Sequence, residues 1–291
     1  MRRATHATRI TLGPLLFGTG LITAGLIAAG CAQAAGEPPD TASEDWRLVF
    51  SDDFDGSALD PAKWHTCYWW DDDGCTISSN AELEWYQPDQ VTVGDGVLTL
   101  RAEPRPIDAS DGESYPYVSG MVSSGRDSSD VGPPPRFSFQ YGFVEARVSV
   151  PDGTGLWPAI WMLPITHESK PEIDILEVYA DPGVAKMRLH WLDTDGERQQ
   201  AREEAEVEDL HAGFHTFGLE WTPEGLRWFI DGAEVWRTDD FVPEEPMYLL
   251  MNLAVGGNSP GPPNPSTVFP ADFVVDWLRV WQPAEIVEAA T

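Results

Sequence analysis

Three carboxylic acids lie close together in the segment Glu172–Glu177, Glu-Ile-Asp-Ile-Leu-Glu, inside an apolar, β-branched run. Side chains alternate between the two faces of a strand, so Glu172 and Asp174 share one face while Glu177 falls on the other. A β-bulge at Ile175-Leu176 would add one residue and bring all three acids to the same face. Carboxylates side by side repel one another, which raises the pKa of at least one of them.

This arrangement points to a particular chemistry. An ionised carboxylate beside a protonated one is the pair that cleaves a glycosidic bond. The alternative is that Glu172 and Glu177 are ordinary strand residues that face solvent. Three acids at this spacing, with a bulge needed to align them, favour the catalytic interpretation.

Aromatic and polar residues near the acids could hold a sugar. If 156–163 is a strand, Trp157 and Trp161 share a face and could stack on sugar rings; the alternative places both indoles in the core. His190 ends the next predicted strand and could orient an acid or bind a sugar hydroxyl, if the two strands pair. The alternative is a histidine with purely local partners. Asn80 begins a polar and aromatic cluster at 80–86, which could also be an irregular loop.

The acids need a sheet to hold them, and from Trp46 onward the chain consists of short apolar runs between clusters of Gly, Pro, Asp and Ser. Asp95-Gly96 and Asp231-Gly232 are typical hairpin turns. Strands at this spacing, without helical periodicity, predict an all-β antiparallel β-sandwich. The charged stretch 195–209 is expected to be a solvated loop or a short surface helix and receives no function. The predicted strands are 46–50, 91–93, 97–102, 139–150, 160–163, 173–179, 187–191, 214–221, 226–230, 247–254 and 273–281.

Charge restricts the partners. The 291 residues carry a net charge of −30, which argues against nucleic acid and disfavours anionic polysaccharides and anionic membranes. A hydrolase of sulfated galactans is disfavoured for the same reason. Neutral glycans remain compatible, and 13 tryptophans supply rings that could stack on them. The hydrophobic fraction of 42% is ample for a core.

Residues 1–34 resemble an export signal, with arginines at 2, 3 and 9, an apolar stretch over 12–29 and the small-x-small site Ala32-Gln33-Ala34. We therefore expect an extracellular protein. One alternative is a lipoprotein box at Ala28-Ala29-Gly30-Cys31, with Cys31 lipidated and the protein anchored to the outer face of the cell membrane. Ala28 replaces the leucine usual in that box, so simple secretion is favoured. An uncleaved membrane anchor is a third option.

Cys67 and Cys75 are then the only unmodified thiols, in an oxidising compartment. A disulfide that closes this short loop is expected. The alternative is two free or buried thiols, and no metal-ligand spacing is present.

Several further motifs follow one another between Trp46 and Gln282. They are Asp52-Asp53-Phe54-Asp55-Gly56, Asn80-Ala81-Glu82-Leu83, the run Tyr-Gly-Phe-Val-Glu-Ala-Arg at 141–147, Leu-Trp-Pro-Ala-Ile-Trp-Met-Leu at 156–163, the acid segment 172–177, Phe-His-Thr-Phe at 214–217, Glu220-Trp221, Asn-Leu-Ala-Val-Gly-Gly at 252–257 and Val-Asp-Trp-Leu-Arg-Val at 275–280. In this order they resemble glycoside hydrolase family 16. The resemblance covers nearly all of the chain after the export signal.

The resemblance implies a concanavalin A-like jelly roll over 46–283 with a concave substrate cleft, preceded by a linker at 35–45 and followed by a tail at 284–291. It also implies a retaining double displacement. In that mechanism Glu172 is similar to the nucleophile, Glu177 to the general acid/base, and Asp174 to a residue that tunes the nucleophile. The aromatic pair resembles glycone-side stacking residues and Asn80 a cleft-lining position.

The substrate class follows from the same comparison. Two residues between Asp174 and Glu177 resemble the laminarinase-like branch, which implies β-1,3-glucans or mixed β-1,3/1,4-glucans. The run His-Trp-Leu-Asp at 190–193 departs from the His-Tyr-Gly-Gly of many laminarinases and resembles the branch of bacterial exopolysaccharide depolymerases and mixed-linkage glucanases. No cofactor is implied for catalysis. Many members bind a structural calcium ion, whose matching positions would be Asp53 and Asp276.

We therefore expect a secreted, monomeric endo-β-glucanase with no membrane span in its mature chain. Two alternatives share the fold: a transglycosylase that passes the sugar to another glycan, and a non-catalytic glucan-binding protein. Non-catalytic relatives usually lose one or both catalytic glutamates, and here both Glu172 and Glu177 are present.

Overall fold

The computed structural model describes residues 38, 45–68, 75–126, 134–166 and 168–289, all within the unit Gln33–Thr291. The export signal, the lipoprotein box and nearly all of the linker lie outside the described residues. Within the described ranges strands are the main regular element, and every strand expected from the apolar runs is present.

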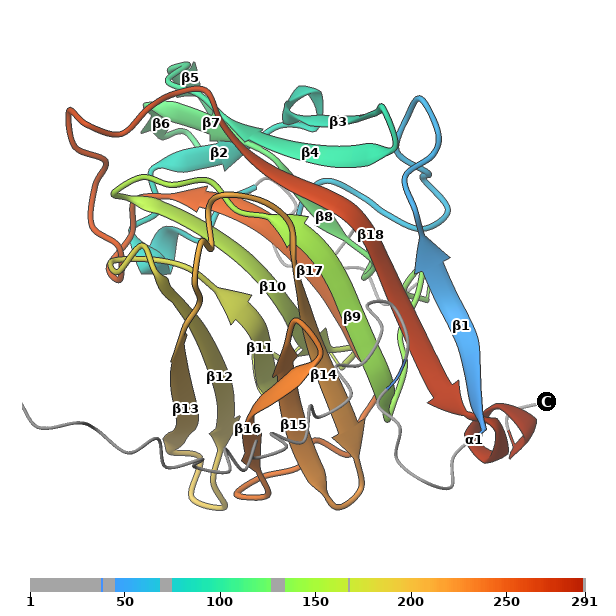
Figure 1. The fold of residues 1–291 in the computed structure, drawn as a ribbon. Helices are drawn as coiled ribbons and strands as arrows, with labels where there is room; N and C mark the ends of the chain where they lie inside the picture. The colour runs from blue at the N-terminus through green and yellow to red at the C-terminus, as the bar shows by residue number, and fades with distance from the viewer. Residues whose placement is uncertain (1–37, 39–44, 69–74, 127–133, 167, 290–291) are drawn as a thin grey trace, which may run out of the picture. The chain divides into compact units, whose positions relative to one another are not determined.

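Two antiparallel sheets form the fold (Figure 1), and this confirms the predicted β-sandwich. The first sheet has eight strands in the order β16-β15-β14-β9-β18-β4-β3, with β1 also paired to β18. The second has six strands in the order β13-β12-β11-β10-β17-β8. The strands of the first sheet are β16 (Ala233–Thr238), β15 (Gly225–Ile230), β14 (His215–Thr222), β9 (Gly142–Ser149), β18 (Ala271–Pro283), β4 (Val97–Ala102), β3 (Val91–Gly94) and β1 (Trp46–Asp52). Those of the second are β13 (Arg198–Glu206), β12 (Val184–Leu192), β11 (Glu172–Glu177), β10 (Leu156–Pro164), β17 (Met247–Val255) and β8 (Met121–Ser123).

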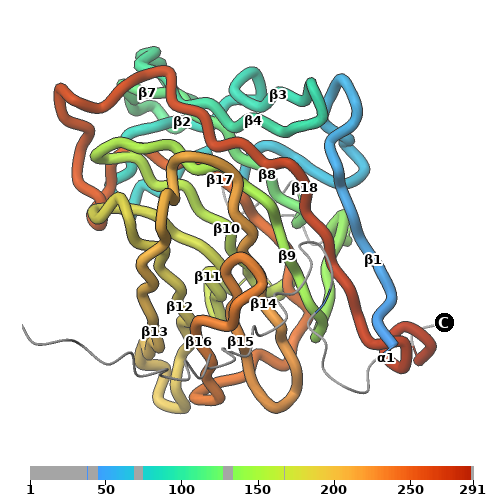
Figure 2. The backbone as a smooth tube through the Cα atoms, viewed as in Figure 1, coloured from blue at the N-terminus to red at the C-terminus, as the bar shows by residue number. Residues whose placement is uncertain are grey.

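Smaller elements complete the fold. The pairs β2–β7 and β5–β6 form two short sheets of their own. The tail expected after residue 283 begins with a short helix, α1 (Ala284–Ala289), and Figure 2 shows it beside the start of β1. The remaining elements are η1 (Ser78–Asn80), β2 (Glu84–Tyr86), η2 (Pro88–Gln90), β5 (Ile107–Asp108), β6 (Ser114–Tyr115) and β7 (Tyr117–Ser119).

The core lies between the two large sheets. Leu219 of β14 and Leu278 of β18 belong to the same buried cluster as Ile173 of β11 and Leu189 of β12. In β11 the inward-facing isoleucine is flanked by the acids, whose side chains point to the opposite face, as alternation along a strand requires. The core therefore fixes the face on which the acids are presented.

The two predicted hairpin turns are present. Asp95-Gly96 joins β3 to β4, and Asp231-Gly232 joins β15 to β16. The φ angles are 54° and 76° in the first turn and 49° and 75° in the second. Positive φ at both central positions matches the right-handed twist of the flanking strands, and Asp followed by Gly tolerates it well.

The expectation for 195–209 is wrong, because most of this stretch is strand β13 at the edge of the six-stranded sheet. Only Ala201 and Ala205 turn their small side chains toward the core, so the apolar alternation is too weak to mark a strand. An edge strand rich in charge resists pairing with other chains.

One core residue ties the two sheets together directly behind the acids. Trp228 is fully buried, donates from Nε1 to the main-chain oxygen of Asp174 at 3.0 Å, and stacks on Trp236 with ring centroids 4.1 Å apart. We expect Trp228→Phe to lower the free energy of unfolding by about 2–3 kcal/mol, from lost volume and an unpaired carbonyl. Trp46→Phe is the control, because its Nε1 has no partner among the described residues. If denaturant unfolding shows equal losses of unfolding free energy for Trp228→Phe and Trp46→Phe, the hydrogen bond from Trp228 does not contribute as expected.

Candidate active site

A cleft of about 720 Å³ lies on the face of the six-stranded sheet that points away from the core. Side chains from β10, β11, β12, β13 and β17 line it, together with the segment 77–82 and the loop 168–170. All seven predicted catalytic and sugar-binding residues lie in this one lining: Asn80, Trp157, Trp161, Glu172, Asp174, Glu177 and His190.

The predicted bulge brings the three acids together. Along β10, Ile160 pairs with Leu176 and the next residue, Trp161, pairs with Asp174, so Ile175 is the additional residue. The pairing with β12 shifts at the same place, between Asp174 and Glu177. This extra residue returns Glu177 to the cleft face.

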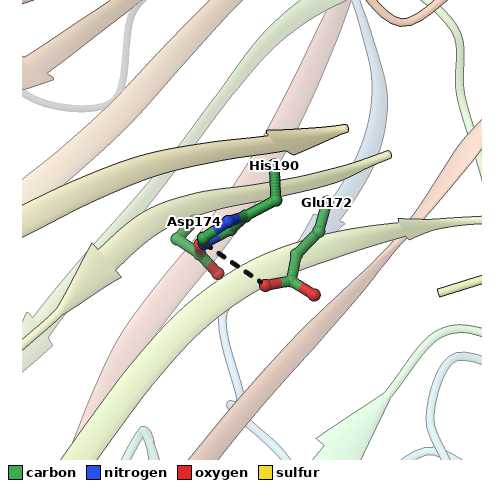
Figure 3. A group of neighbouring side chains, drawn as sticks. All are labelled: Glu172, Asp174 and His190. Carbon is green, nitrogen blue, oxygen red and sulfur yellow. Dashed lines mark ion pairs between the residues drawn. The ribbon is translucent and has the colours of Figure 1, made fainter. Parts of the chain in front are cut away.

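His190 lies against the first two acids, and Figure 3 shows its ring beside Asp174, with Glu172 close by. The strand pairing on which its role depended is present, because Glu172 is opposite His190 in the ladder between β11 and β12. His190 Nε2 lies 3.8 Å from Glu172 Oε1 and 3.6 Å from Asp174 Oδ2. Burial lowers the pKa of His190, which favours a neutral ring beside the acids.

A lysine that the sequence analysis overlooked contacts Glu172. Lys170 Nζ lies 2.7 Å from Glu172 Oε2, and both side chains are largely buried. One oxygen of Glu172 therefore faces a cation and the other faces the histidine.

Asp174 is a buried carboxyl between two others. Burial raises its pKa well above the usual range, and the charges of Glu172 and Glu177 raise it further. A protonated Asp174 can donate a hydrogen bond, whereas an ionised one would repel its neighbours. The site thus favours one neutral acid at the centre of the row.

Glu177 is held by two donors at the other end of the row. Trp157 Nε1 donates to Glu177 Oε1 at 2.8 Å, and Arg188 Nε donates to Glu177 Oε2 at 2.8 Å. Burial raises the pKa of Glu177 to about 7, against the opposing effects of the Arg188 charge and the Trp157 hydrogen bond. A carboxyl with this pKa can both give and take a proton near neutral pH.

The other predicted sugar-binding residues are also held in place. Trp161 Nε1 donates to Asn252 Oδ1 at 2.8 Å, and Asn80 Nδ2 donates to Glu82 Oε1 at 3.0 Å. Trp161 is 7% exposed and packs partly into a small apolar cluster, whereas Trp157 is half-buried at the cleft surface. Both indoles line the cleft, so the interpretation that both are simple core residues is wrong.

Sequence reasoning missed Lys170, Arg188 and Asn252, and it missed Tyr179, which accepts a hydrogen bond from Arg188. The alternation of side chains along a strand could have identified Arg188, because Arg188 stands two residues before His190 and so shares its face. Lys170 stands two residues before Glu172, but it lies in a loop where no such period applies.

The two remaining structural predictions have different outcomes. The disulfide Cys67–Cys75 is present, with Cα atoms 5.1 Å apart. Asp53 and Asp276 each face an arginine: Arg279 Nη2 lies 2.7 Å from Asp53, and Arg147 Nη1 lies 2.5 Å from Asp276. These contacts do not test calcium binding, so the calcium site stays a prediction.

The amino-acid sequence matches a known protein family and several characterised relatives. The family model described as glycosyl hydrolases family 16 matches residues 78–279. An endo-1,3-1,4-beta-glycanase, EglC of Rhizobium meliloti, is 35% identical over 80% of this chain and 51% of its own length. A beta-glucanase of Rhodothermus marinus is 34% identical over 88% of this chain and 92% of its own length. The chain spans about half the length of the first curated relatives that it matches.

Solved structures of laminarinases are similar to this chain in both fold and sequence. The catalytic domain of a laminarinase from Thermotoga petrophila has a TM-score of 0.71 at 28% identity, covering 83% of this chain and all of that one. The laminarinase of Rhodothermus marinus has a TM-score of 0.69 at 31% identity, covering 83% and 99%. The chain belongs to glycosyl hydrolase family 16, as its motifs predicted.

The contact between Arg188 and Glu177 leads to a testable pH dependence. The role of general acid that the motifs predict for Glu177 requires its protonated form, so activity should fall as pH rises through the pKa of about 7. Because Arg188 favours the ionised form, Arg188→Gln should raise that pKa and move the alkaline limb of kcat/KM to higher pH. Arg188→Lys, which keeps the charge, should move it less. Arg101→Gln, which breaks an exposed pair with Asp272, is the control; an unmoved limb in Arg188→Gln would contradict the assignment.

Proposed function

We propose that this protein is a secreted, retaining endo-glycosidase that hydrolyses β-1,3-glucans or mixed β-1,3/1,4-glucans. The observation that carries the proposal is the pair Glu172 and Glu177 on one face of a bulged strand in an open cleft. The two residues have different environments: a lysine and a histidine lie beside Glu172, and two donors hold the buried Glu177. Different environments are what assign different roles to paired carboxyls.

The first step follows from these environments. Glu177, protonated below a pH of about 7, donates its proton to the oxygen of the scissile bond as that bond breaks. Ionised Glu172 attacks the anomeric carbon from the opposite side, and a covalent glycosyl-enzyme forms. Glu177 is then ionised, and Arg188 and Trp157 remain in position to stabilise its charge.

The second step returns the site to its starting state. Glu177 takes a proton from a water molecule, which attacks the anomeric carbon and releases Glu172. Protonated Asp174 can donate to Glu172 as the negative charge returns to it. His190 and Lys170 keep Glu172 oriented through both displacements.

The names of relatives and the cleft lining support the substrate class. The relatives are named as endo-1,3-1,4-beta-glycanases, beta-glucanases and glucan endo-1,3-beta-glucosidases. Trp157 and Trp161 present indoles on which sugar rings can stack. The signal-like segment 1–34 supports secretion, and no helix in the described part of the chain is long and apolar enough to cross a membrane.

Reducing-sugar release and product length on laminarin, barley mixed-linkage glucan, agarose and xyloglucan test the proposal. We expect rapid shortening of laminarin or barley glucan. Oligosaccharides longer than the starting material would instead identify a transglycosylase. Glucan binding without cleavage of any of the four would identify a binding protein and overturn the hydrolase.

A further inference from the structure

Positive charge gathers on one wall of the cleft. Four cationic side chains line the cleft: Arg188 of β12, Arg198 and Arg202 of β13, and Lys170 of the loop before β11. The opposite wall, from β10, β17 and the segment 77–82, contributes no lysine or arginine to the described lining. This distribution is unexpected in a chain with a net charge of −30.

Two of these four cationic side chains form no ion pair with the acids of the cleft. Lys170 is paired with Glu172 and Arg188 with Glu177. Arg198 and Arg202 are exposed, and neither forms an ion pair or a side-chain hydrogen bond with any residue that the structure describes. In a protein with 48 acidic and 18 basic residues, most cations find a carboxylate easily, as Lys186 on the neighbouring strand does with Glu204. Arg198 and Arg202 are exposed and line the cleft, so both are available to a ligand there.

The strand register places both arginines on the substrate face. Arg202 is opposite Arg188, which is opposite Asp174, so one row crosses β13, β12 and β11. Neighbouring strands are about 4.8 Å apart, which sets the backbone of Arg202 roughly 10 Å from that of Asp174. Gln200 is opposite His190, and Arg198 lies two residues further along the same face. The arginines thus flank the reacting centre from the side and would meet groups attached to the sugar chain.

We propose that Arg198 and Arg202 bind an anionic substituent, a carboxylate or a sulfate, on the β-glucan that occupies the cleft. The inference rests on the proposed function and narrows its substrate to an acidic or acid-substituted glucan. The planar guanidinium matches both anions through paired hydrogen bonds. Local cations are also what an anionic polymer needs to approach a protein whose overall charge would repel it.

The competing explanation is that β13 is charged only because it is an edge strand, where charge prevents pairing with other chains. That explanation predicts neither a particular sign for the charges on β13 nor any effect of these charges on substrate cleavage. It does not account for the distribution along β13, where the two arginines line the cleft and Glu203, Glu204 and Glu206 do not.

The test compares three forms of barley mixed-linkage glucan: unsubstituted, lightly carboxymethylated and lightly sulfated. We expect the wild-type protein to show a higher kcat/KM on at least one anionic form, and the better form identifies the anion. Arg198→Gln and Arg202→Gln should each remove roughly fivefold of that preference, as expected for a charge-assisted contact of about 1 kcal/mol. The double variant should show no preference among the three forms. Added salt should reduce the wild-type preference.

The control variant is Arg237→Gln, which removes an exposed arginine of β16 that pairs with Glu234 and does not line the cleft. It should leave the preference unchanged. Cleavage of the unsubstituted glucan with no preference for either anionic form, or a preference that survives in the double variant, overturns this inference alone. Failure to cleave any form overturns the proposed function and this inference with it.

Discussion

Glu172→Gln is expected to lower kcat on β-glucan by at least about 10⁴-fold while the fold survives, because the amide cannot attack the anomeric carbon. Glu172 is half-buried at the cleft surface and belongs to no part of the core, so its loss should leave the sandwich intact. The neighbouring Lys170 would lose its charged partner but can turn toward the cleft.

The measurement is initial rate on laminarin and barley glucan, with circular dichroism and thermal unfolding of the same sample. Glu206→Gln is the matched control, since it makes the same substitution at an exposed position of β13 outside the cleft lining. If the Glu172→Gln protein is unfolded, the role of Glu172 is structural and not catalytic. A folded variant with near-normal turnover would exclude it as the nucleophile.

Glu177→Gln should also lower kcat on glucan, by about 10³- to 10⁴-fold, but with a different dependence on substrate. Without an acid, departure of a sugar oxygen is slow, whereas an activated leaving group such as dinitrophenolate needs no proton. The first step on a dinitrophenyl glycoside should therefore remain fast. The alkaline limb of the pH profile, which reports the pKa of about 7, should disappear.

Azide supplies the control for the second step of this variant. A small anionic nucleophile needs no general base, so azide should restore turnover of the dinitrophenyl substrate in Glu177→Gln and have little effect on Glu172→Gln. Equal losses on the activated and the natural substrate, with no response to azide, would show that Glu177 does not act as the acid/base.

The acid row could be predicted because its evidence is local. Glu172, Asp174 and Glu177 lie within six residues, and alternation along one strand shows that a bulge is needed to align them. The β-sandwich could also be predicted from the sequence, because apolar runs and turn residues such as Asp231-Gly232 are local signals.

Residues that act across strands were harder to predict. Arg188 reaches Glu177 only because β12 pairs with β11 in one register, and the register depends on the bulge and on packing against the other sheet. Lys170 reaches Glu172 from a loop. Nothing in the sequence states these distances, although the residue types were visible.

The distribution of charge shows the same limit. A net charge of −30 argues against anionic partners, but it does not show where the few cations lie. Strand β13 was missed because only Ala201 and Ala205 face the core, and with it the sequence analysis missed the arginines that it brings to the cleft. Charge totals describe long-range repulsion, whereas recognition depends on local arrangement.

The central claim is a covalent intermediate on Glu172, and trapping it is the most direct test. The protein is incubated with a 2-deoxy-2-fluoro glucosyl substrate that carries a good leaving group, which slows the second step more than the first. Peptide mass spectrometry then locates the added sugar. One sugar is expected on Glu172, and none on the Glu172→Gln protein. A sugar attached to any other residue, or hydrolysis of the substrate with inversion and no labelled peptide, would contradict it.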